Sequence, residues 1–289
     1  MKINDIFQNT DRTILSFEVF PPKKDSPIES VYYKLDGIAA QKPDFISVTY
    51  GAGGAGAKNR TGMIAARIQN NYGIPAMAHL TCVGNTEETA EAQLREFREM
   101  GIENVLALRG DRVSGMEIET DFLHASDLAS FISNQPKLGF DIAGACYPEV
   151  HPESDNEVED ILNLKCKVDA GVSHLVSQLF FDNDSFYSFR ERCQLAGINV
   201  PIEAGIMPVT NKKQIERMVT MCGAGLPAKF SRMMMKYEDK PEALRDAGIA
   251  YAINQIIDLI SSGVDGIHLY TMNNPYVAEK ITSAVRNLL

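Results

Sequence analysis

Seven of the eight apolar, strand-like runs of this chain carry polar side chains of chemically useful types at or near their C-terminal ends. These side chains are Glu18, Thr49, His79, Asp111, Tyr147 with His151, Gln178 and Asn273, while the seventh run ends at Gly205. A buried strand normally excludes such groups, because an unpaired buried polar group costs a few kcal/mol. The recurrence predicts that the ends of the runs face one cavity, where carboxylates, imidazoles and amides can transfer protons and hold a ligand.

Glu18 is the strongest candidate for a catalytic residue, because it lies in SFEVFPP between Phe17 and Val19. Apolar surroundings disfavour the charged form of a carboxylate, which makes Glu18 a candidate general acid near neutral pH. The alternative is a structural Glu that pairs with an Arg or Lys inside the fold. Local sequence leaves both interpretations open.

Asp111 and two histidines offer further chemistry. Asp111, in ALRGD, is a candidate acid, an acceptor for a heterocycle, or a partner of Arg109, and Gly110 lets a ligand approach the backbone closely. His79 and His151 lack a local ligand spacing such as His-x-x-x-His, so no metal site is predicted. A role in hydrogen bonding or in contacting a phosphate fits them better.

Two further features each have two readings. Asp160, Asn163 and Lys167 recur at helical spacing in EDILNLKCK, either as a solvated face or as a polar stripe directed at a ligand's ribose and phosphates. Gln178, in VSQLFFD, is either a clamp for a substrate amide or a core Gln with satisfied hydrogen bonds.

The elements that position these residues alternate along the chain. The apolar runs begin near residues 14, 44, 76, 104, 141, 174, 200 and 266. Most intervals are about 30 residues, the length of one βαβ unit, which predicts an α/β fold made of a single (β/α)8 barrel with its site at the C-terminal face. The last interval is about twice as long and predicts an extra helix between strands 7 and 8. Residues 1–289 are expected to form one catalytic domain without a regulatory domain.

Composition narrows the class of partner. The net charge of −10 disfavours binding to nucleic acid or to an anionic membrane surface. No stretch approaches the roughly 18 apolar residues of a membrane span. The five cysteines contain no Cys-x-x-Cys pair and are expected to be reduced, as in a cytoplasmic protein.

The segment GAGGAG, at residues 51–56, matches the Gly-x-Gly-x-x-Gly pattern of dinucleotide-binding folds. Such folds also require an acidic residue about 20 positions later for the ribose. No Asp or Glu occurs from Gly51 to Thr86, so the segment is interpreted as a loop at the site rather than a Rossmann fingerprint.

Nine segments, taken in order, carry a family resemblance. They are SFEVFPPK, FISVTYGAGG, AHLTC, LALRGD, YPEVHPE, DILNLKCKVDAG, SQLFFD, GIMPVTN and HLYTMN. Together they resemble bacterial methylenetetrahydrofolate reductases across nearly the whole chain. The resemblance implies an FAD-containing oxidoreductase of one-carbon metabolism and methionine biosynthesis. It would reduce 5,10-methylenetetrahydrofolate to 5-methyltetrahydrofolate with NADH or NADPH by a ping-pong mechanism, as a homo-oligomer.

The resemblance also implies roles for individual residues. Glu18 matches the general acid that assists opening of the folate ring, and Asp111 matches a catalytic carboxylate that contacts the pterin near the flavin. Gln178 and Gln214 match substrate-binding positions, with Gln178 also contacting the nicotinamide. The flavin-binding positions correspond to Thr49, Tyr50, Ala52, His79, Arg109, Gly110, Asp111, Ala125, Tyr147, His151, Asp160, Asn163 and Lys167.

Three positions depart from the family pattern. Cys166 stands where an Arg often lies beside the flavin phosphates, and Asn274 stands where an Arg usually lies near the folate. Met218 stands where some members place an aromatic residue against the nicotinamide, which leaves a protein electron donor as an alternative to NADH.

Two rival functions remain at this point. One is a flavin- or folate-binding partner subunit that works inside a larger electron- or methyl-transfer complex without its own NADH turnover. The other is an aldolase or isomerase acting on a phosphorylated substrate. The strand runs contain no Lys for a Schiff base, and the segments after runs seven and eight lack a glycine-rich phosphate loop, which argues against the second.

Overall fold

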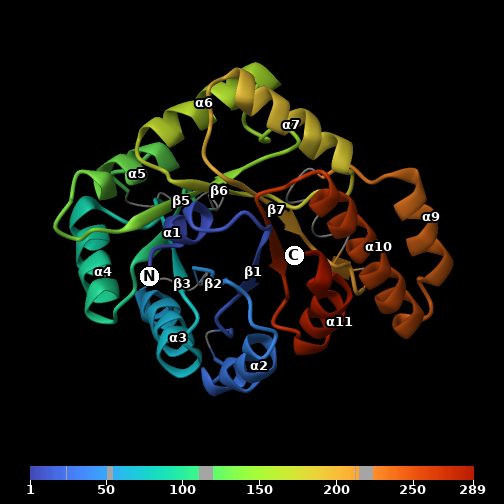
Figure 1. The fold of residues 1–289 in the computed structure, drawn as a ribbon. Helices are drawn as coiled ribbons and strands as arrows, with labels where there is room; N and C mark the ends of the chain where they lie inside the picture. The colour runs from blue at the N-terminus through green and yellow to red at the C-terminus, as the bar shows by residue number, and fades with distance from the viewer. Residues whose placement is uncertain (24, 51–54, 111–119, 212, 215–223) are drawn as a thin grey trace.

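Eight parallel strands close into a barrel in which β1 pairs with both β2 and β8 (Figure 1). The computed structural model describes residues 1–23, 25–50, 55–110, 120–211, 213–214 and 224–289, with only the backbone for residues 55–59. The strands are β1 (Ile14–Val19), β2 (Phe45–Val48), β3 (Ala76–Thr81), β4 (Asn104–Leu108), β5 (Asp141–Cys146), β6 (His174–Ser177), β7 (Ile202–Ile206) and β8 (Gly266–Tyr270). The predicted (β/α)8 barrel is confirmed.

Helices follow the strands and surround the barrel (Figure 1). They are α2 (Glu29–Ala39), α3 (Ala55–Tyr72), α4 (Glu87–Glu99), α5 (Ala125–Ser133), α6 (Glu157–Asp169), α7 (Asn183–Leu195), α9 (Ala228–Tyr237), α10 (Pro241–Ser261) and α11 (Pro275–Val285). A 3-10 turn, Arg286–Leu288, follows α11. None of the helices in the described ranges has the length and apolar character needed to cross a bilayer.

Local sequence sets where several of these helices start and stop. Thr86 accepts a hydrogen bond from the Thr89 backbone N–H and caps α4, and Asn156 caps α6 in the same way. Gly101 follows α4 with φ of 80°, a left-handed conformation in which glycine has no Cβ penalty.

Helices α9 and α10 occupy the long interval between β7 and β8, which confirms the predicted additional helix. The α10 helix buries Ile256 and Leu259 in the main core. The α9 helix packs through Phe230, whose ring lies 4.6 Å from the Phe181 ring and 4.8 Å from the Tyr251 ring. Phe181 and Phe230 belong to a second apolar cluster, separate from the main core, which also contains Met207 and Val209 just after β7.

A short N-terminal helix, α1 (Ile3–Gln8), lies at the N-terminal ends of the strands (Figure 1). Ile3 is fully buried, and its backbone N–H donates to the side chain of Asn104 at the start of β4. The next backbone N–H, of Asn4, donates to Asp141 at the start of β5. The α1 helix thus covers the N-terminal end of the barrel, and the predicted site lies at the opposite end.

Candidate active site

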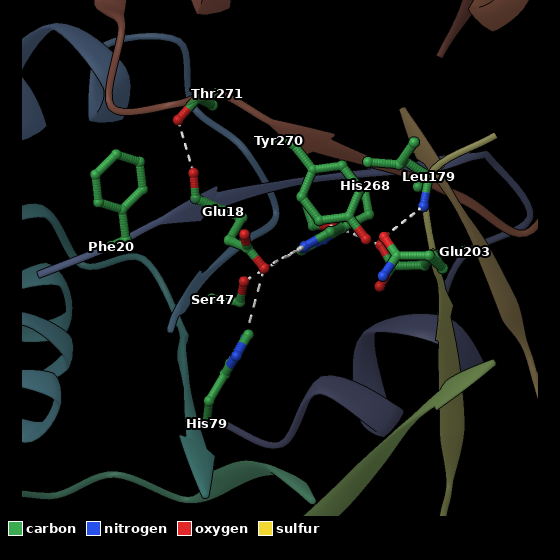
Figure 2. Close-up of polar contacts among 12 residues, drawn as sticks. Glu18, Phe20, Ser47, His79, Leu179, Glu203, His268, Tyr270 and Thr271 are labelled. Atoms are coloured by element: carbon green, nitrogen blue, oxygen red, sulfur yellow. Dashed lines mark hydrogen bonds and ion pairs between the residues drawn. The ribbon is translucent and has the colours of Figure 1, made fainter. Parts of the chain in front are cut away.

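Glu18 lies near the end of β1 and points into the barrel, between two imidazoles (Figure 2). Its Oε2 atom lies 3.8 Å from Nε2 of His79 on β3 and 3.8 Å from Nε2 of His268 on β8. Phe17 and Val19 are fully buried in the core between barrel and helices, because successive residues of a strand face opposite sides. The apolar neighbours in sequence are therefore not the contacts of the carboxylate, which among the described residues lies next to histidines rather than Arg or Lys.

His79 is a neutral imidazole at physiological pH. Burial lowers its pKa to about 4, although the nearby Glu18 carboxylate acts in the opposite direction. Its Nε2 atom is buried and has no hydrogen-bond partner among the described residues. A buried polar atom of this kind, directed at the candidate acid, is suited to contact a ligand.

A second imidazole, His268, connects Glu18 with residues deeper in the barrel. Its Nδ1 atom lies 2.6 Å from the hydroxyl of Ser16. That hydroxyl also lies 2.6 Å from Oε1 of Glu203, on β7. The sequence reasoning missed Ser16, Glu203 and His268, although a carboxylate inside the apolar run IEAGI is the same signal that identified Glu18.

Five of the predicted flavin-binding residues gather between the ends of β4 and β5 and the α6 helix. The rings of Tyr147 and His151 meet edge to face at 4.5 Å, and Asp160 accepts a hydrogen bond from the His151 backbone N–H at 3.4 Å. Burial lowers the pKa of His151, Asp160 raises it, and the positive charges of Arg109 and Lys167 lower it. The structure thus brings these five residues within electrostatic range of one another.

Lys167 reaches inward from α6. Its Nζ atom donates to the carbonyl oxygen of Ala145 at 2.6 Å, and burial lowers its pKa. Asn163, one turn earlier on α6, is exposed. Of the predicted polar stripe, Asp160 and Lys167 therefore turn toward the barrel, whereas Asn163 lies at the solvent surface. Cys166, the first departure from the family pattern, is also exposed.

The remaining described flavin-binding candidates lie around the same end of the barrel. The carbonyl of Thr49 accepts from the Thr61 hydroxyl at 3.0 Å, just after β2, and Ala125 is the first residue of α5. Tyr50 is half-buried beside the main core. Gly110 has φ of 85°, and a Cβ there would lie 3.1 Å from Cβ of Thr81, so both backbone conformation and space favour glycine.

The two candidate substrate amides differ in their hydrogen bonding. Gln178 is half-buried, and its Oε1 accepts from the Leu179 backbone N–H at 2.9 Å. Gln214 is 8% exposed, and its Oε1 accepts from the backbone N–H and the hydroxyl of Thr210. The Nε2 atom of Gln214 is buried without a partner in the described chain, so one amide donor is available to a ligand.

The two asparagines after β8 have structural roles. Asn273 accepts from the Phe20 backbone N–H at 3.0 Å and donates to the Phe20 carbonyl at 2.7 Å, which ties the ends of β1 and β8 together. Asn274 caps α11 by accepting from the backbone N–H groups of Tyr276 and Val277. The capping explains what the Asn side chain does where the family pattern has an Arg. Three other predicted positions, Ala52, Asp111 and Met218, lie outside the described residues.

Comparisons with known proteins agree with this architecture. The sequence matches the family described as Methylenetetrahydrofolate reductase over residues 2–286. It is 38% identical to the 5,10-methylenetetrahydrofolate reductase of Escherichia coli over 259 residues, covering 90% of this chain and 86% of that protein. It is 37% identical to "Methylenetetrahydrofolate reductase (NADH) 1" of Arabidopsis thaliana, covering 91% of this chain and 46% of the plant protein.

Solved structures show the same fold in distant proteins. A protein from Clostridium thermocellum, described as binding two copies of 5-methyl-5,6,7,8-tetrahydrofolic acid, superimposes with a TM-score of 0.63 at 15% identity and covers 99% of this chain and 98% of its own. A dihydropteroate synthase from Xanthomonas albilineans gives a TM-score of 0.55 at 14% identity, with 96% and 93% coverage. At these identities the likeness concerns the fold. The sequence matches decide the family: this chain belongs to the methylenetetrahydrofolate reductase family.

Proposed function

We propose that this protein reduces 5,10-methylenetetrahydrofolate to 5-methyltetrahydrofolate, with FAD as cofactor, NADH or NADPH as electron donor, and Glu18 as general acid. The observation that carries the proposal is the position of Glu18, a carboxyl group set between His79 and His268 at the open end of a barrel of this family. The plant relative named for NADH supports a nicotinamide donor.

The chemistry of the residues at the ends of β4 and β5 fits a flavin dinucleotide. Lys167 and Arg109 carry positive charges that complement phosphates, and Asp160 offers carboxylate oxygens to ribose hydroxyls. Arg109 pairs with Glu153 at the rim, so phosphate binding would compete with that carboxylate. The Nε2 atom of His79, which has no hydrogen-bond partner in the part of the chain that the structure describes, offers a contact for a ring system.

Bound FAD would supply the two-electron chemistry that no amino-acid side chain provides. Glu18 would donate a proton to the substrate nitrogen that leaves the methylene carbon as the five-membered ring opens. This proton transfer produces a free amine and an iminium carbon able to accept hydride. Neutral His79 beside the carboxyl avoids fixing Glu18 in a permanent ion pair, which keeps its proton available.

Gln178 and Gln214 would orient the folate. The buried Nε2 of Gln214 has no hydrogen-bond partner among the described residues, and a substrate carbonyl or ring nitrogen would satisfy it. Because nicotinamide and folate would occupy the same face in turn, we expect ping-pong kinetics. We further propose that residues 1–289 act as one catalytic barrel in a cytoplasmic homo-oligomer.

The test uses the purified protein with added FAD. A flavin absorbance spectrum, oxidation of NADH with a quinone acceptor, and formation of 5-methyltetrahydrofolate are measured in turn. Activity in all three supports the proposal. Flavin binding without NADH oxidation would instead favour a subunit that receives electrons from a partner protein, and a protein that binds no FAD would refute the flavoenzyme assignment.

A further inference from the structure

Glu203 is a carboxylate enclosed in the middle of the barrel, away from the open end where ligands would bind. It is 0% exposed, its Oε1 has a single close partner in the Ser16 hydroxyl, and its Oε2 has no hydrogen-bond partner in the described chain. The barrel makes room for it, because a Cβ on Gly266 of the adjacent strand would lie 2.8 Å from Cγ of Glu203. A carboxylate buried with so few partners is costly to keep for structure alone.

The contacts of Glu203 lead directly to Glu18 (Figure 2). Ser16 lies 2.6 Å from both Oε1 of Glu203 and Nδ1 of His268. The opposite ring nitrogen of His268, Nε2, lies 3.4 Å from the Ser47 hydroxyl and 3.8 Å from Oε2 of Glu18. A serine hydroxyl has one hydrogen to donate. Ser16 can therefore donate to Glu203 or to His268, but not to both at once.

The two choices correspond to two tautomers of His268. When Glu203 is protonated it donates to Ser16, Ser16 donates to Nδ1, and neutral His268 presents a hydrogen on Nε2 toward Glu18. When Glu203 is ionised it accepts from Ser16, Ser16 accepts from Nδ1–H, and neutral His268 presents a lone pair on Nε2. The protonation state of Glu203 thus decides whether Glu18 faces a donor or an acceptor.

We propose that Glu203 stores the proton that returns to Glu18 through Ser16 and His268, and that it sets the tautomer of His268 while doing so. The part concerning Glu18 rests on the proposed function. Glu203 is a positioning residue, because it acts only through the two residues between it and the acid.

The transfer is balanced at every atom. The Glu203 O–H bond breaks as its hydrogen passes to Ser16 Oγ, the Ser16 hydrogen passes to Nδ1 of His268, and the Nε2 hydrogen passes to Glu18. The result is one ionised Glu203, one protonated Glu18 and His268 in the other tautomer. The last transfer requires the 3.8 Å separation to shrink by about 1 Å to hydrogen-bond length.

The surroundings of Glu203 bring the pKa of its carboxyl group close to neutral pH. Burial raises its pKa to about 7, His268 on β8 and the Ser16 hydrogen bond lower it, and the carboxylates of Asp44 and Asp265 raise it. Ser16 lies on β1 and His268 on β8, and the two aspartates immediately precede β2 and β8. A proton held with this affinity is released and recovered near neutral pH.

The test of the tautomer uses protein without ligands, labelled with 15N in histidine. Nitrogen shifts of His268 are followed by NMR from about pH 6 to about pH 8.5, where an unperturbed carboxyl would not titrate. In the native protein we expect the ring hydrogen to move from Nε2 to Nδ1 with a midpoint near the pKa of Glu203. Glu203→Gln cannot ionise, so its hydrogen bonding to Ser16 does not change with pH, and we expect the ring hydrogen of His268 not to move between Nε2 and Nδ1 over this range.

Two further variants make the result decisive. Ser16→Ala breaks the connection while retaining Glu203, and should abolish the tautomer change in the same way. Glu99→Gln makes the same chemical change at an exposed position of α4 and should leave the titration as in the native protein. A native His268 whose tautomer does not change over this range would overturn the proposal, even if neither barrel variant folded. Identical titrations in the native protein and Glu203→Gln would overturn it equally.

The catalytic consequence is measured separately with FAD-loaded protein. Glu203→Gln should slow repeated folate reduction by at least about tenfold, while reduction of the flavin by NADH stays within about twofold of native. Unchanged folate turnover in this variant would refute the proton-return role. If the native protein itself reduced no folate, the proposed function would fail, and the tautomer measurement would still decide the coupling of Glu203 to His268.

Discussion

Glu18 and His79 lie 3.8 Å apart at the open end of the barrel without forming a fixed ion pair at neutral pH. The imidazole is buried, and its pKa of about 4 leaves it uncharged above that value. The distance alone would allow a salt bridge, but the cost of charging a buried histidine outweighs the attraction of the carboxylate. Glu18 therefore has a polar neighbour that carries no charge at neutral pH, as the proposed role of Glu18 as general acid requires.

Substitution of Glu18 separates the two halves of the proposed reaction. Glu18→Gln removes the transferable proton but keeps the shape of the side chain. We expect folate reduction to fall by about 10²–10⁴-fold, the usual contribution of a general acid. Reduction of bound flavin by NADH needs no proton from Glu18 and should remain near the native rate. Stopped-flow absorbance of each half-reaction checks this, and normal rates in both would show that Glu18 is not the acid.

Glu203 makes stability depend on pH with a definite sign. Its pKa is raised in the folded protein to about 7 from 4.5, so the folded state holds an extra proton between these values. The stability that this provides is complete below about pH 4.5 and is lost as the pH rises through about 7. Because Gln cannot ionise, Glu203→Gln should resemble the native protein near about pH 5 and be more stable by up to about 3 kcal/mol near about pH 8.

Urea unfolding at both pH values measures the difference. Glu99→Gln, on the exposed face of α4, serves as the matched control and should show no comparable change between the two conditions. A Glu203→Gln protein that is less stable than the native one by the same amount at both pH values would mean that Glu203 does not gain a proton on folding.

His174 should weaken the fold in acid. It lies at the closed end of the barrel, with its ring 5.4 Å from Phe7 and 6.2 Å from Phe45, and burial lowers its pKa to about 4. Since the unfolded chain takes up a proton below about pH 6.5 and the folded one does not, stability is present above that value and is lost as the pH falls toward 4. Each such histidine contributes at most about 3 kcal/mol to this loss.

The variant His174→Gln removes one of these buried imidazoles. Its free energy of unfolding should change less than that of the native protein between about pH 7 and about pH 4.5. Only the difference between the two proteins is compared, because the protonation of Glu203 affects both equally. Equal pH dependence in both proteins would contradict a neutral, buried His174.

Lys167 provides a test of the proposed flavin site. Lys167→Met keeps an apolar stem but removes the charged donor beneath α6. We expect FAD to bind about 10- to 100-fold more weakly, as for the loss of a charge-assisted hydrogen bond. Lys165→Met, on the same helix, removes a lysine that pairs with Asp169 at the surface and should leave FAD affinity near native. Fluorescence titration of the apoprotein with FAD compares the two, and equal effects would place the phosphates elsewhere.

Much of the architecture was predictable because each strand and helix pair of the barrel has a similar length, so the apolar strands recur at regular intervals in the sequence. The apolar runs at intervals of about 30 residues correctly predicted the eight strands, and the polar residues at their ends predict which face is functional. Glu18 was predicted to be functional because a carboxylate between Phe17 and Val19 is unusual in an apolar strand, where burying it is costly. The long interval before the last strand likewise predicted an extra helix, and α9 and α10 occupy that interval.

The contacts around Glu18 were decided by closure of the barrel. Ser16 and Glu203 are 187 positions apart, and Ser16 and His268 are 252 apart, yet each pair is separated by 2.6 Å because β7, β8 and β1 lie side by side. Nothing local distinguishes His268 from an ordinary core histidine. Asn273 and Asn274 likewise lie at a strand end as a ligand-binding residue would, but their side chains join β1 to β8 and cap α11. A strand's own residues determine which way a side chain points, whereas its partners depend on which strands close the ring.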